Sequence, residues 1–283
     1  MGWTTSIRNR CASGHRAAIV VLLLALAPLG ARANDLADVV KSGQISVALY
    51  KEFAPFSDEG KGVDVDIAKA LAGKLGVKLA ELWFDADENM EDDLRNMVWR
   101  GTLFGYGPAD FMIHVPVDKE YMSRNDKVIF FAPYYRERFA IARNVEKIAN
   151  LDSLAPFRTE KIGVESATYP DTVLLSIESG AYRNNVVHFK NTDEAIEALK
   201  KGEVAAVMAM QGELEGGLFN SKGFEISEPP IPVIGRRQWP LGLAVKAGNE
   251  ELARALQKGI NDLVADGTIQ KIFDRYGVKY RAP

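Results

Sequence analysis

Short apolar runs alternate along the chain with longer segments in which apolar residues recur every three or four positions. The short runs are typical of buried strands, and the longer segments are typical of amphipathic helices. The predicted strands are Ile45–Tyr50, Val77–Phe84, Ala109–Val115, Lys161–Glu165, Asn185–Lys190, Val204–Met210 and Leu241–Lys246. The predicted helices are Asp35–Lys41, Asp64–Leu75, Glu88–Trp99, Pro170–Ser179, Ala195–Lys201, Asn249–Ala265 and Thr268–Tyr276. This alternation predicts an α/β protein with mainly parallel sheets.

Local signals also indicate where several helices begin and end. Gly43 and Gly76 are predicted to end the helices that they follow, because glycine readily takes the left-handed conformation found there. Pro170 suits the first turn of a helix, and Asn191 is a helix-capping residue. The Gly- and Pro-rich segment 215–232 is predicted to be mostly loop.

The stretch Ala109–Glu137 has the features of one wall of a cleft. Its strand is interrupted at Pro116, which cannot continue a central strand, and a polar loop follows. The aromatic segment Lys127–Tyr135 comes next, with Arg136 and Arg138 close behind it. A buried strand that ends in such a loop, beside aromatic and cationic side chains, is a common way to build a binding surface.

Residues 1–33 have the pattern of a secretory signal peptide. Arginines come first, the apolar run Ala17–Leu29 follows, and Ala31-Arg32-Ala33 resembles a cleavage site. The only cysteine, Cys11, precedes the apolar run and is not placed to carry a lipid anchor. We therefore expect a periplasmic protein without a membrane anchor, starting near Asn34.

The composition after residue 33 narrows the possible functions. Four of the 35 Lys and Arg residues and none of the 38 Asp and Glu residues lie before residue 34, so the remaining chain has a formal charge of −7. This acidic balance argues against a nucleic acid as partner. Since no cysteine remains, no disulfide bond or thiol chemistry is expected.

The sequence contains no catalytic or cofactor-binding motif that we could identify. It lacks G-x-S-x-G, H-E-x-x-H, the P-loop and the Rossmann glycine pattern. His114 and His188 have no metal-ligand spacing, and the acidic run 85–93 lacks the pattern of a calcium loop. We expect no resident metal or cofactor and no enzymatic activity.

A series of motifs resembles the type II periplasmic solute-binding proteins. In chain order these motifs are Tyr50 with Pro55-Phe56-Ser57, Gly62–Asp66, Ala109–Ile113, Phe130–Tyr135, Leu199–Val204 and Asp266–Gly277. The resemblance implies a two-lobed periplasmic-binding-protein-like II fold with the lobes joined by two crossing strands. It places lobe one at residues 34–138 and 239–283 and lobe two at residues 139–238, with a ligand cleft between the lobes and closure by a hinge motion.

A narrower resemblance involves residues 88–118. The run Glu88–Gly101, followed by Gly105–Asp118, is similar to the subfamily associated with quinoprotein (PQQ-dependent) alcohol and methanol dehydrogenases, the MxaJ and XoxJ proteins. It implies that the dehydrogenase, and with it the cytochrome c of the same system, are partners.

The sequence departs from the amino-acid-binding members of the family at both ends of their ligand clamp. Those members place hydroxyl groups and a carboxylate-binding Arg after the third strand, where this chain has His114–Lys119 and no Arg before Arg124. Their second lobe supplies an Asp where this chain has Met210 or Gln211. An ordinary amino acid is therefore a poor ligand, although the hydroxyls of Ser166 and Thr168 could receive an anion at a helix start.

Methanol is a poor ligand as well. At a ceiling of about 1.5 kcal/mol of binding free energy per heavy atom, the two heavy atoms of methanol supply roughly 3 kcal/mol. This corresponds to binding that is weaker than millimolar. The cleft is better suited to a larger apolar object, such as a segment of a partner protein or a cofactor, or it stays empty.

Several residues are candidates for contacting a ligand or a partner in the cleft. They are Tyr50, Phe53, Phe56, His114, Val115, Tyr134, Ser166, Thr168, Gln211, Arg237 and Trp239. Some have a plain structural alternative: His114 could be a hydrogen-bonded core residue, and Arg237 a solvated surface arginine.

Three functions stay open at this point. The main hypothesis is a periplasmic accessory protein that assists assembly or activation of a PQQ-dependent dehydrogenase. The alternative is an ABC-transporter receptor for a small molecule other than an ordinary amino acid. The third is an enzyme on the same scaffold, as in the dehydratases that resemble these receptors, and it would require converging acids in the cleft.

Overall fold

A computed structural model describes residues 35–87, 89–231 and 238–283. The predicted signal peptide, residues 1–33, lies outside the described residues, as do Glu88 and Arg237. In the described part no helix is long and apolar enough to cross a membrane.

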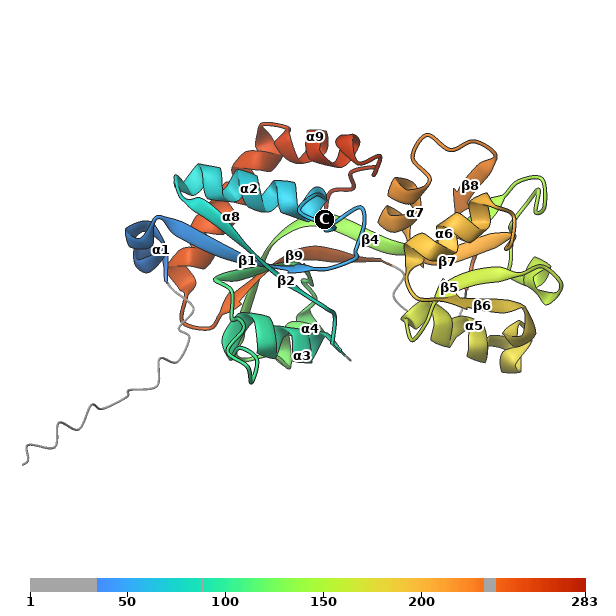
Figure 1. Ribbon diagram of the computed structural model, residues 1–283, viewed down its shortest axis with the longest axis horizontal. Helices are drawn as coiled ribbons and strands as arrows, with labels where there is room; N and C mark the ends of the chain where they lie inside the picture. Colours follow the sequence, from blue (N-terminus) through green and yellow to red (C-terminus); the bar gives the residue numbers. More distant parts are fainter. Residues whose placement is uncertain (1–34, 88, 232–237) are drawn as a thin grey trace, which may run out of the picture. The chain divides into compact units, whose positions relative to one another are not determined.

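The strands form one mixed sheet (Figure 1). They are β1 (Gln44–Tyr50), β2 (Lys78–Phe84), β3 (Phe111–Pro116), β4 (Val128–Asn144), β5 (Ile162–Glu165), β6 (Val186–Phe189), β7 (Ala206–Met210), β8 (Phe224–Ser227) and β9 (Gln238–Lys246). Their order is β2-β1-β3-β9-β4-β7-β5-β6, and β8 pairs with β4.

The helices follow the predicted positions closely. The α-helices are α1 (Leu36–Ser42), α2 (Val63–Leu75), α3 (Met90–Leu94), α4 (Lys119–Ser123), α5 (Tyr169–Gly180), α6 (Thr192–Lys200), α7 (Gln211–Gly217), α8 (Glu250–Ala265) and α9 (Thr268–Arg275). Gly43 and Gly76 end α1 and α2 with φ near +69°, as predicted. The side chain of Asn191 caps α6 by accepting from the Glu194 N–H.

Four of these helices and strands were not predicted. The longest is strand β4, which includes most of the aromatic segment Lys127–Tyr135, to which no strand was assigned. Helix α4 lies in the loop expected after Asp118, and α7 and β8 lie in or next to the segment expected to be mostly loop. The helix predicted for Glu88–Trp99 is instead α3 followed by a π-helical turn, Arg95–Trp99.

The expectation of mainly parallel sheets was wrong. Strands β1, β2 and β3 are parallel to one another, and so are β5, β6 and β7. Strand β9, however, lies between β3 and β4 and is antiparallel to both, and β4 is antiparallel to β7 and β8. The physical reason is that β4 leads out of the group β1–β3 and β9 leads back to it. These two strands therefore run in opposite directions through the middle of the sheet.

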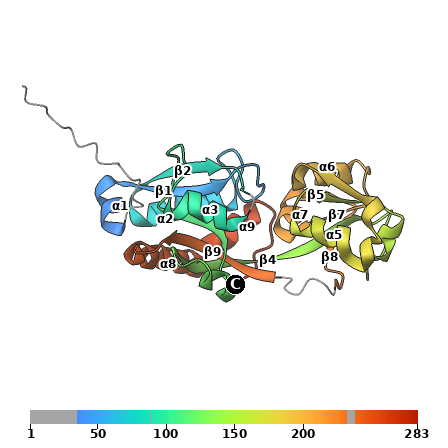
Figure 2. The same cartoon turned by 90° about the horizontal axis from the view of Figure 1, so that it is seen from below.

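Strand β4 runs from one group of strands and helices to the other (Figures 1 and 2). Each group has its own hydrophobic core, which consists of two clusters of buried residues. Its first part, Val128–Arg138, pairs with β9, and its second part, Phe139–Asn144, pairs with β7 and β8. One core takes its residues from positions 39–135 and 241–278, and the other from positions 140–231. The architecture confirms the two-domain periplasmic-binding-protein-like fold, whereas the residue boundaries of the lobes stay a prediction.

Candidate functional site

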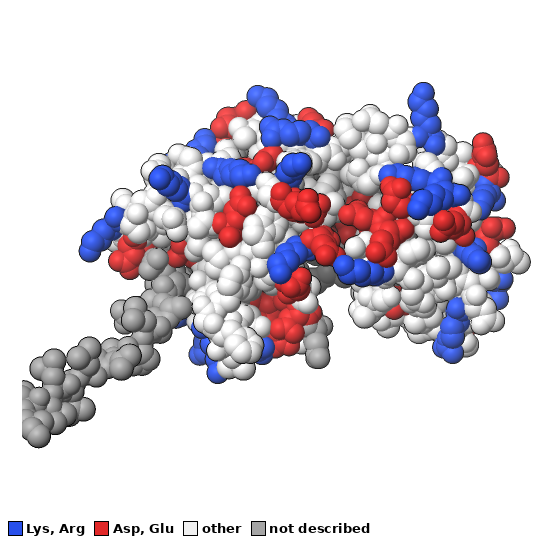
Figure 3. Space-filling model, in the orientation of Figure 1, with Lys and Arg blue, Asp and Glu red and all other residues white. Residues whose placement is uncertain are grey.

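A cavity of about 640 Å³ is lined by residues from two groups of strands and the segments next to them, the group β1–β3 and the group β5–β7. Tyr50, Phe53 and His114 line it from the β1–β3 side, and Glu165, Thr192 and Glu213 line it from the β5–β7 side. Its volume is within the range of small-molecule sites. In Figure 3 acidic side chains gather toward the middle of the face shown, with lysine and arginine side chains at their edges.

His114 is held by a buried carboxylate from α2. Its Nδ1 lies 2.8 Å from Asp64 Oδ2, and the Tyr134 hydroxyl donates to Asp64 Oδ1 at 2.6 Å. His114 sits at a bulge in the β3–β9 pairing with φ of 66°, a conformation that is uncommon for residues other than glycine. Its Nε2 is buried and has no hydrogen-bond partner in the described chain.

Aromatic rings surround His114 on the same wall. The Phe53 ring meets the imidazole edge-on at a centroid distance of 4.8 Å, and the Phe56 ring does so at 4.4 Å. Tyr50 lies 5.9 Å from Phe53, and its hydroxyl donates to Asp93 Oδ2 at 2.7 Å. The part of this wall around His114 is therefore aromatic, and the imidazole Nε2 is its one buried polar atom without a partner in the described chain.

The opposite wall carries two carboxyl groups. Glu165, the last residue of β5, accepts from the Thr192 N–H at 3.1 Å and from the Thr192 hydroxyl at 3.0 Å. Glu213, on α7, is 6% exposed. Burial, and in second place the Glu165 carboxylate, raise the pKa of Glu213 well above its usual range. Burial also raises the pKa of Glu165, although the bonds from Thr192 oppose this.

A second aromatic group lines the cavity where the chain passes between the strand groups. The Phe139 ring lies 5.5 Å from Tyr169 and 4.8 Å from Trp239. All three residues line the cavity. They come from β4, α5 and β9, so this group joins the two crossing strands to the start of α5.

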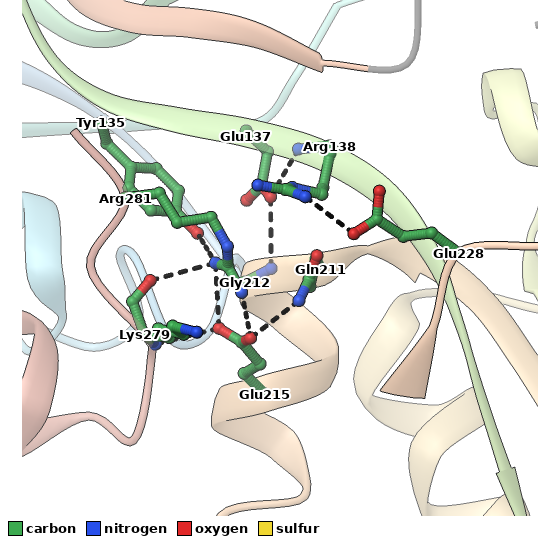
Figure 4. Close-up of polar contacts among 9 residues, drawn as sticks. All are labelled: Tyr135, Glu137, Arg138, Gln211, Gly212, Glu215, Glu228, Lys279 and Arg281. Carbon is green, nitrogen blue, oxygen red and sulfur yellow. Dashed lines mark hydrogen bonds and ion pairs between the residues drawn. The ribbon is translucent and has the colours of Figure 1, made fainter. Parts of the chain in front are cut away.

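A polar cluster beside the crossing strands ties α7 to the C-terminal segment (Figure 4). Arg281 Nη1 lies 3.1 Å from Glu215 Oε2, its Nη2 contacts Glu215 Oε1, and Nη1 also donates to the Tyr135 hydroxyl at 2.9 Å. Glu137 Oε1 accepts from the Arg138 N–H and the Gly212 N–H, while its Oε2 has no partner in the described chain. Burial raises the pKa of Glu137 to about 7.

The structure brings together part of the predicted set. Tyr50, Phe53, His114, Thr168 and Trp239 line the cavity. Phe56, Val115 and Tyr134 are instead fully buried in the core, where they support the wall rather than form it. Gln211 donates to Glu215 Oε1, Ser166 is exposed and is absent from the lining, and Arg237 lies outside the described residues.

The expected anion site at the start of α5 is already occupied by the protein's own groups. The Ala167 N–H donates to the Asp171 carboxylate at 2.9 Å, and Pro170 has no N–H to offer. The hydroxyls of Ser166 and Thr168 donate to the carbonyls of Phe189 and Glu165. The helix start therefore offers few free donors to an anion.

Sequence reasoning missed Glu165, Thr192 and Glu213. Glu165 had a usable signal, because polar residues at the carboxyl ends of parallel strands meet at one edge of a sheet. Glu213 had a weaker signal, because it lies three residues after the predicted strand Val204–Met210, in a short stretch to which no element was assigned. Among the described residues, no group of three or more His, Cys, Asp and Glu side chains could hold a metal ion.

The model of the bacterial extracellular solute-binding proteins, family 3, matches residues 119–279, which is more than half of the chain. The chain belongs to this family. As a member, it is a solute-binding protein of the type that serves as an ABC-transporter receptor.

Its relatives include proteins named for amino acids. A probable histidine-binding protein of Neisseria gonorrhoeae is 23% identical over 93% of this chain and 94% of its own length. An arginine-binding ABC transporter protein of Escherichia coli is 23% identical over 91% of this chain and 97% of its own length. The glutamine-binding ABC transporter protein of Bacillus subtilis is 23% identical over 78% of this chain and 74% of its own length.

Solved structures of similar proteins show the same fold. An ancestral cationic amino acid solute-binding protein has a TM-score of 0.66 and 21% identity, covering 86% of this chain and 99% of its own. An amino acid ABC transporter substrate-binding protein from Streptococcus pneumoniae, bound to L-arginine, has a TM-score of 0.64 and 20% identity, covering 86% and 97%.

Proposed function

We propose that this protein is a periplasmic receptor that delivers a small organic solute to an ABC transporter. The observation that carries the proposal is the cavity of about 640 Å³, which is lined by residues of both strand groups. Buried polar groups line it on both sides, namely the His114 imidazole on one wall and the Glu213 carboxyl on the other. Such a cavity, mostly apolar with a few placed polar groups, is typical of a solute site.

The solute differs from an ordinary α-amino acid. The wall that would hold a carboxylate is built from Tyr50, Phe53 and His114, none of which is a fixed cation. Lys51 lines the cavity, but its ammonium group pairs with Asp85 at 3.0 Å. A carboxylate buried without a cationic or N–H partner would lose more hydration energy than it regains.

A ligand screen by thermal unfolding tests the receptor function. A solute at a hundred times its dissociation constant stabilises the folded state by about 2.7 kcal/mol and raises the melting temperature by several degrees. Ala86→Trp, at an exposed position on the cavity lining, should abolish the shift. Ala149→Trp, at an exposed position outside the lining, should keep it. If no compound in a broad library raises the melting temperature, the receptor function is wrong.

A second candidate function is that of an accessory protein of a PQQ-dependent alcohol or methanol dehydrogenase. It is supported by the resemblance of residues 88–118 to that subfamily. It is also supported by Leu103 and Phe104, which lie in this run and are 91% and 99% exposed. Exposed apolar side chains of this size often mark a surface for a protein partner.

Association with the purified dehydrogenase, with and without its cytochrome c, tests this second candidate. Leu103→Ser combined with Phe104→Ser should weaken the association and lower dehydrogenase activation. Val264→Ser, which changes an exposed apolar residue on α8, is the matched control. If the unmodified protein neither associates with the dehydrogenase nor changes its activity, this candidate is eliminated.

An enzymatic function on the same scaffold would have a use for Glu165 and Glu213, because two carboxyl groups on one wall are a common acid–base arrangement. It makes a different prediction from the receptor function. A receptor returns its solute unchanged after release, whereas an enzyme converts it. Chemical analysis of the compound recovered after prolonged incubation therefore separates the two.

A further inference from the structure

We propose that the solute is an aliphatic amine with at least two protonated nitrogens and no carboxylate. This inference rests on the proposed receptor function, since it specifies what the cavity binds. It follows from the polar atoms that the two walls offer, which are hydrogen-bond acceptors on both sides.

The acidic wall lacks a positive charge of its own. Among the described residues, no lysine or arginine forms an ion pair with Glu165 or Glu213. Thr192, which carries no charge, donates both its N–H and its hydroxyl to Glu165. Burial disfavours the charged form of Glu213, and an ammonium group in contact with it would reverse this effect.

The opposite wall offers one buried acceptor without a partner in the described chain, His114 Nε2. Glu52 and Asn89 also line this side, but Glu52 pairs with Lys190 and Asn89 is hydrogen-bonded to Asp92. Because an ionised Asp64 can only accept, the proton between Asp64 and His114 belongs to His114 Nδ1. A neutral imidazole with its proton on Nδ1 has a lone pair on Nε2, and this buried atom has no partner in the described chain. While the imidazole is neutral, an N–H donor of the solute satisfies this lone pair, whereas a carboxylate oxygen does not.

Five aromatic residues form a further part of the lining. Tyr50 and Phe53 line the cavity on the imidazole side, and Phe139, Tyr169 and Trp239 line it near the crossing strands. Aromatic rings attract ammonium groups and also cover alkyl chains well. An alkyl chain with nitrogen at both ends combines these requirements.

Two features disfavour a carboxylate on the same solute. The one lysine or arginine among the described lining residues, Lys51, pairs with Asp85. At the start of α5 the Ala167 N–H is taken by Asp171. An amino acid would therefore bring an unpartnered anion into a cavity that is already lined by three carboxyl groups, those of Glu52, Glu165 and Glu213.

Calorimetric titration with matched pairs of compounds tests this inference. Cadaverine differs from L-lysine, and agmatine from L-arginine, only by the carboxylate. Each amine should bind at least about tenfold more tightly than its amino acid, because the amino acid must bury a carboxylate without a partner. Glu213→Gln should weaken amine binding by about tenfold or more, while Glu203→Gln, at an exposed acid outside the lining, should leave it unchanged.

The folding of Glu213→Gln is checked by its melting temperature, and Glu165→Gln provides a second variant with the same expected loss of amine binding. Equal or tighter binding of the amino acids would overturn the inference, as would the absence of binding by both amines. A neutral or anionic compound that binds in the broad library screen would leave the receptor function standing and overturn only the inference about the amine. The absence of any ligand would overturn both.

Discussion

Arg281 and Glu215 form a bidentate ion pair that joins the segment after α9 to α7. The two side chains are only 10% and 14% exposed. The Lys279 N–H and the Gln211 side-chain amide donate to the same carboxylate, each at 2.9 Å, and the Tyr135 hydroxyl accepts from Arg281. The pair therefore connects an element of one hydrophobic core with an element of the other.

Replacing Arg281 with alanine should destabilise the protein by up to about 3–5 kcal/mol, because it leaves a carboxylate that is only 14% exposed without its cation. Urea unfolding measures this loss. Arg275→Ala is the matched control, since the pair of Arg275 with Asp66 has an arginine side chain that is 62% exposed. An exposed pair is expected to contribute less than about 1 kcal/mol. Equal losses in the two variants would contradict the assignment of Arg281 as the link.

Glu137 should make the stability of the protein depend on pH. Burial raises its pKa from 4.5 to about 7 in the folded state. The folded state therefore binds the proton more tightly than the unfolded state, and this contribution to stability is lost as the pH rises from about 4.5 through 7. The cost of ionising Glu137 above pH 7 is about 3 kcal/mol, since each pKa unit corresponds to about 1.4 kcal/mol.

Glu137→Gln should reduce this loss, because glutamine keeps an oxygen for the N–H groups of Arg138 and Gly212 without ionising. The free energy of unfolding, measured at intervals between pH 5 and 8, tests it. Glu203→Gln should retain the slope of the unmodified protein. An unchanged slope in Glu137→Gln would show that another group causes the pH dependence.

Asp64→Asn should move the proton of the neutral His114 imidazole from Nδ1 to Nε2. Asparagine can donate to Nδ1, which would move the imidazole proton to Nε2 and remove the acceptor from the cavity. We expect a loss of about 1–3 kcal/mol in stability from the weakened buried bond. Solute binding should also be lost.

The ¹⁵N chemical shifts of the histidine rings report the proton positions. His188, whose Nε2 lies 3.0 Å from Asp171 Oδ1, is the internal control and should not change. If His114 keeps its proton on Nδ1 in Asp64→Asn, then Asp64 does not set the position of the imidazole proton.

Gly212→Ala should destabilise the contact of α7 with the first group of strands. A Cβ at this position would lie 2.5 Å from Phe56 Cζ and 2.7 Å from Glu137 Oε2. Forcing these groups apart costs about 1–3 kcal/mol. Gly73→Ala, at a helical position with nothing within 4 Å of the added Cβ, should instead stabilise the protein by up to about 1 kcal/mol. Thermal unfolding of the two variants compares these opposite effects.

Much of the fold could be predicted because its signals are local. Gly43, Gly76 and Asn191 end or cap helices through their own backbone conformation or their own side chain, so neighbouring residues suffice to predict those positions. Helices α4 and α7 escaped prediction because they are short and lack an apolar stripe of sufficient length. Strand β8 was missed because it lies in a segment rich in glycine and proline.

The candidate site was predicted less completely, since it depends on contacts between distant residues. Tyr50, Phe53 and His114 were found because they lie at or near the ends of predicted strands, where binding residues commonly occur. Phe56 and Tyr134 belong to the same aromatic segments, but packing turns them into the core. No local pattern distinguishes these two outcomes.

The sequence alone determined the α/β architecture and the two-lobed family fold. It also showed that no arginine stands between the third predicted strand and Arg124, where the family usually has its carboxylate-binding arginine. Only the tertiary structure decided that β9 inserts between β3 and β4, that Asp64 holds His114 from 50 residues away, and that Glu165 and Glu213 line one wall. The physical reason is that periodicity and capping act within a few residues. The partner of a strand or of a buried carboxylate is instead chosen by the packing of the whole chain.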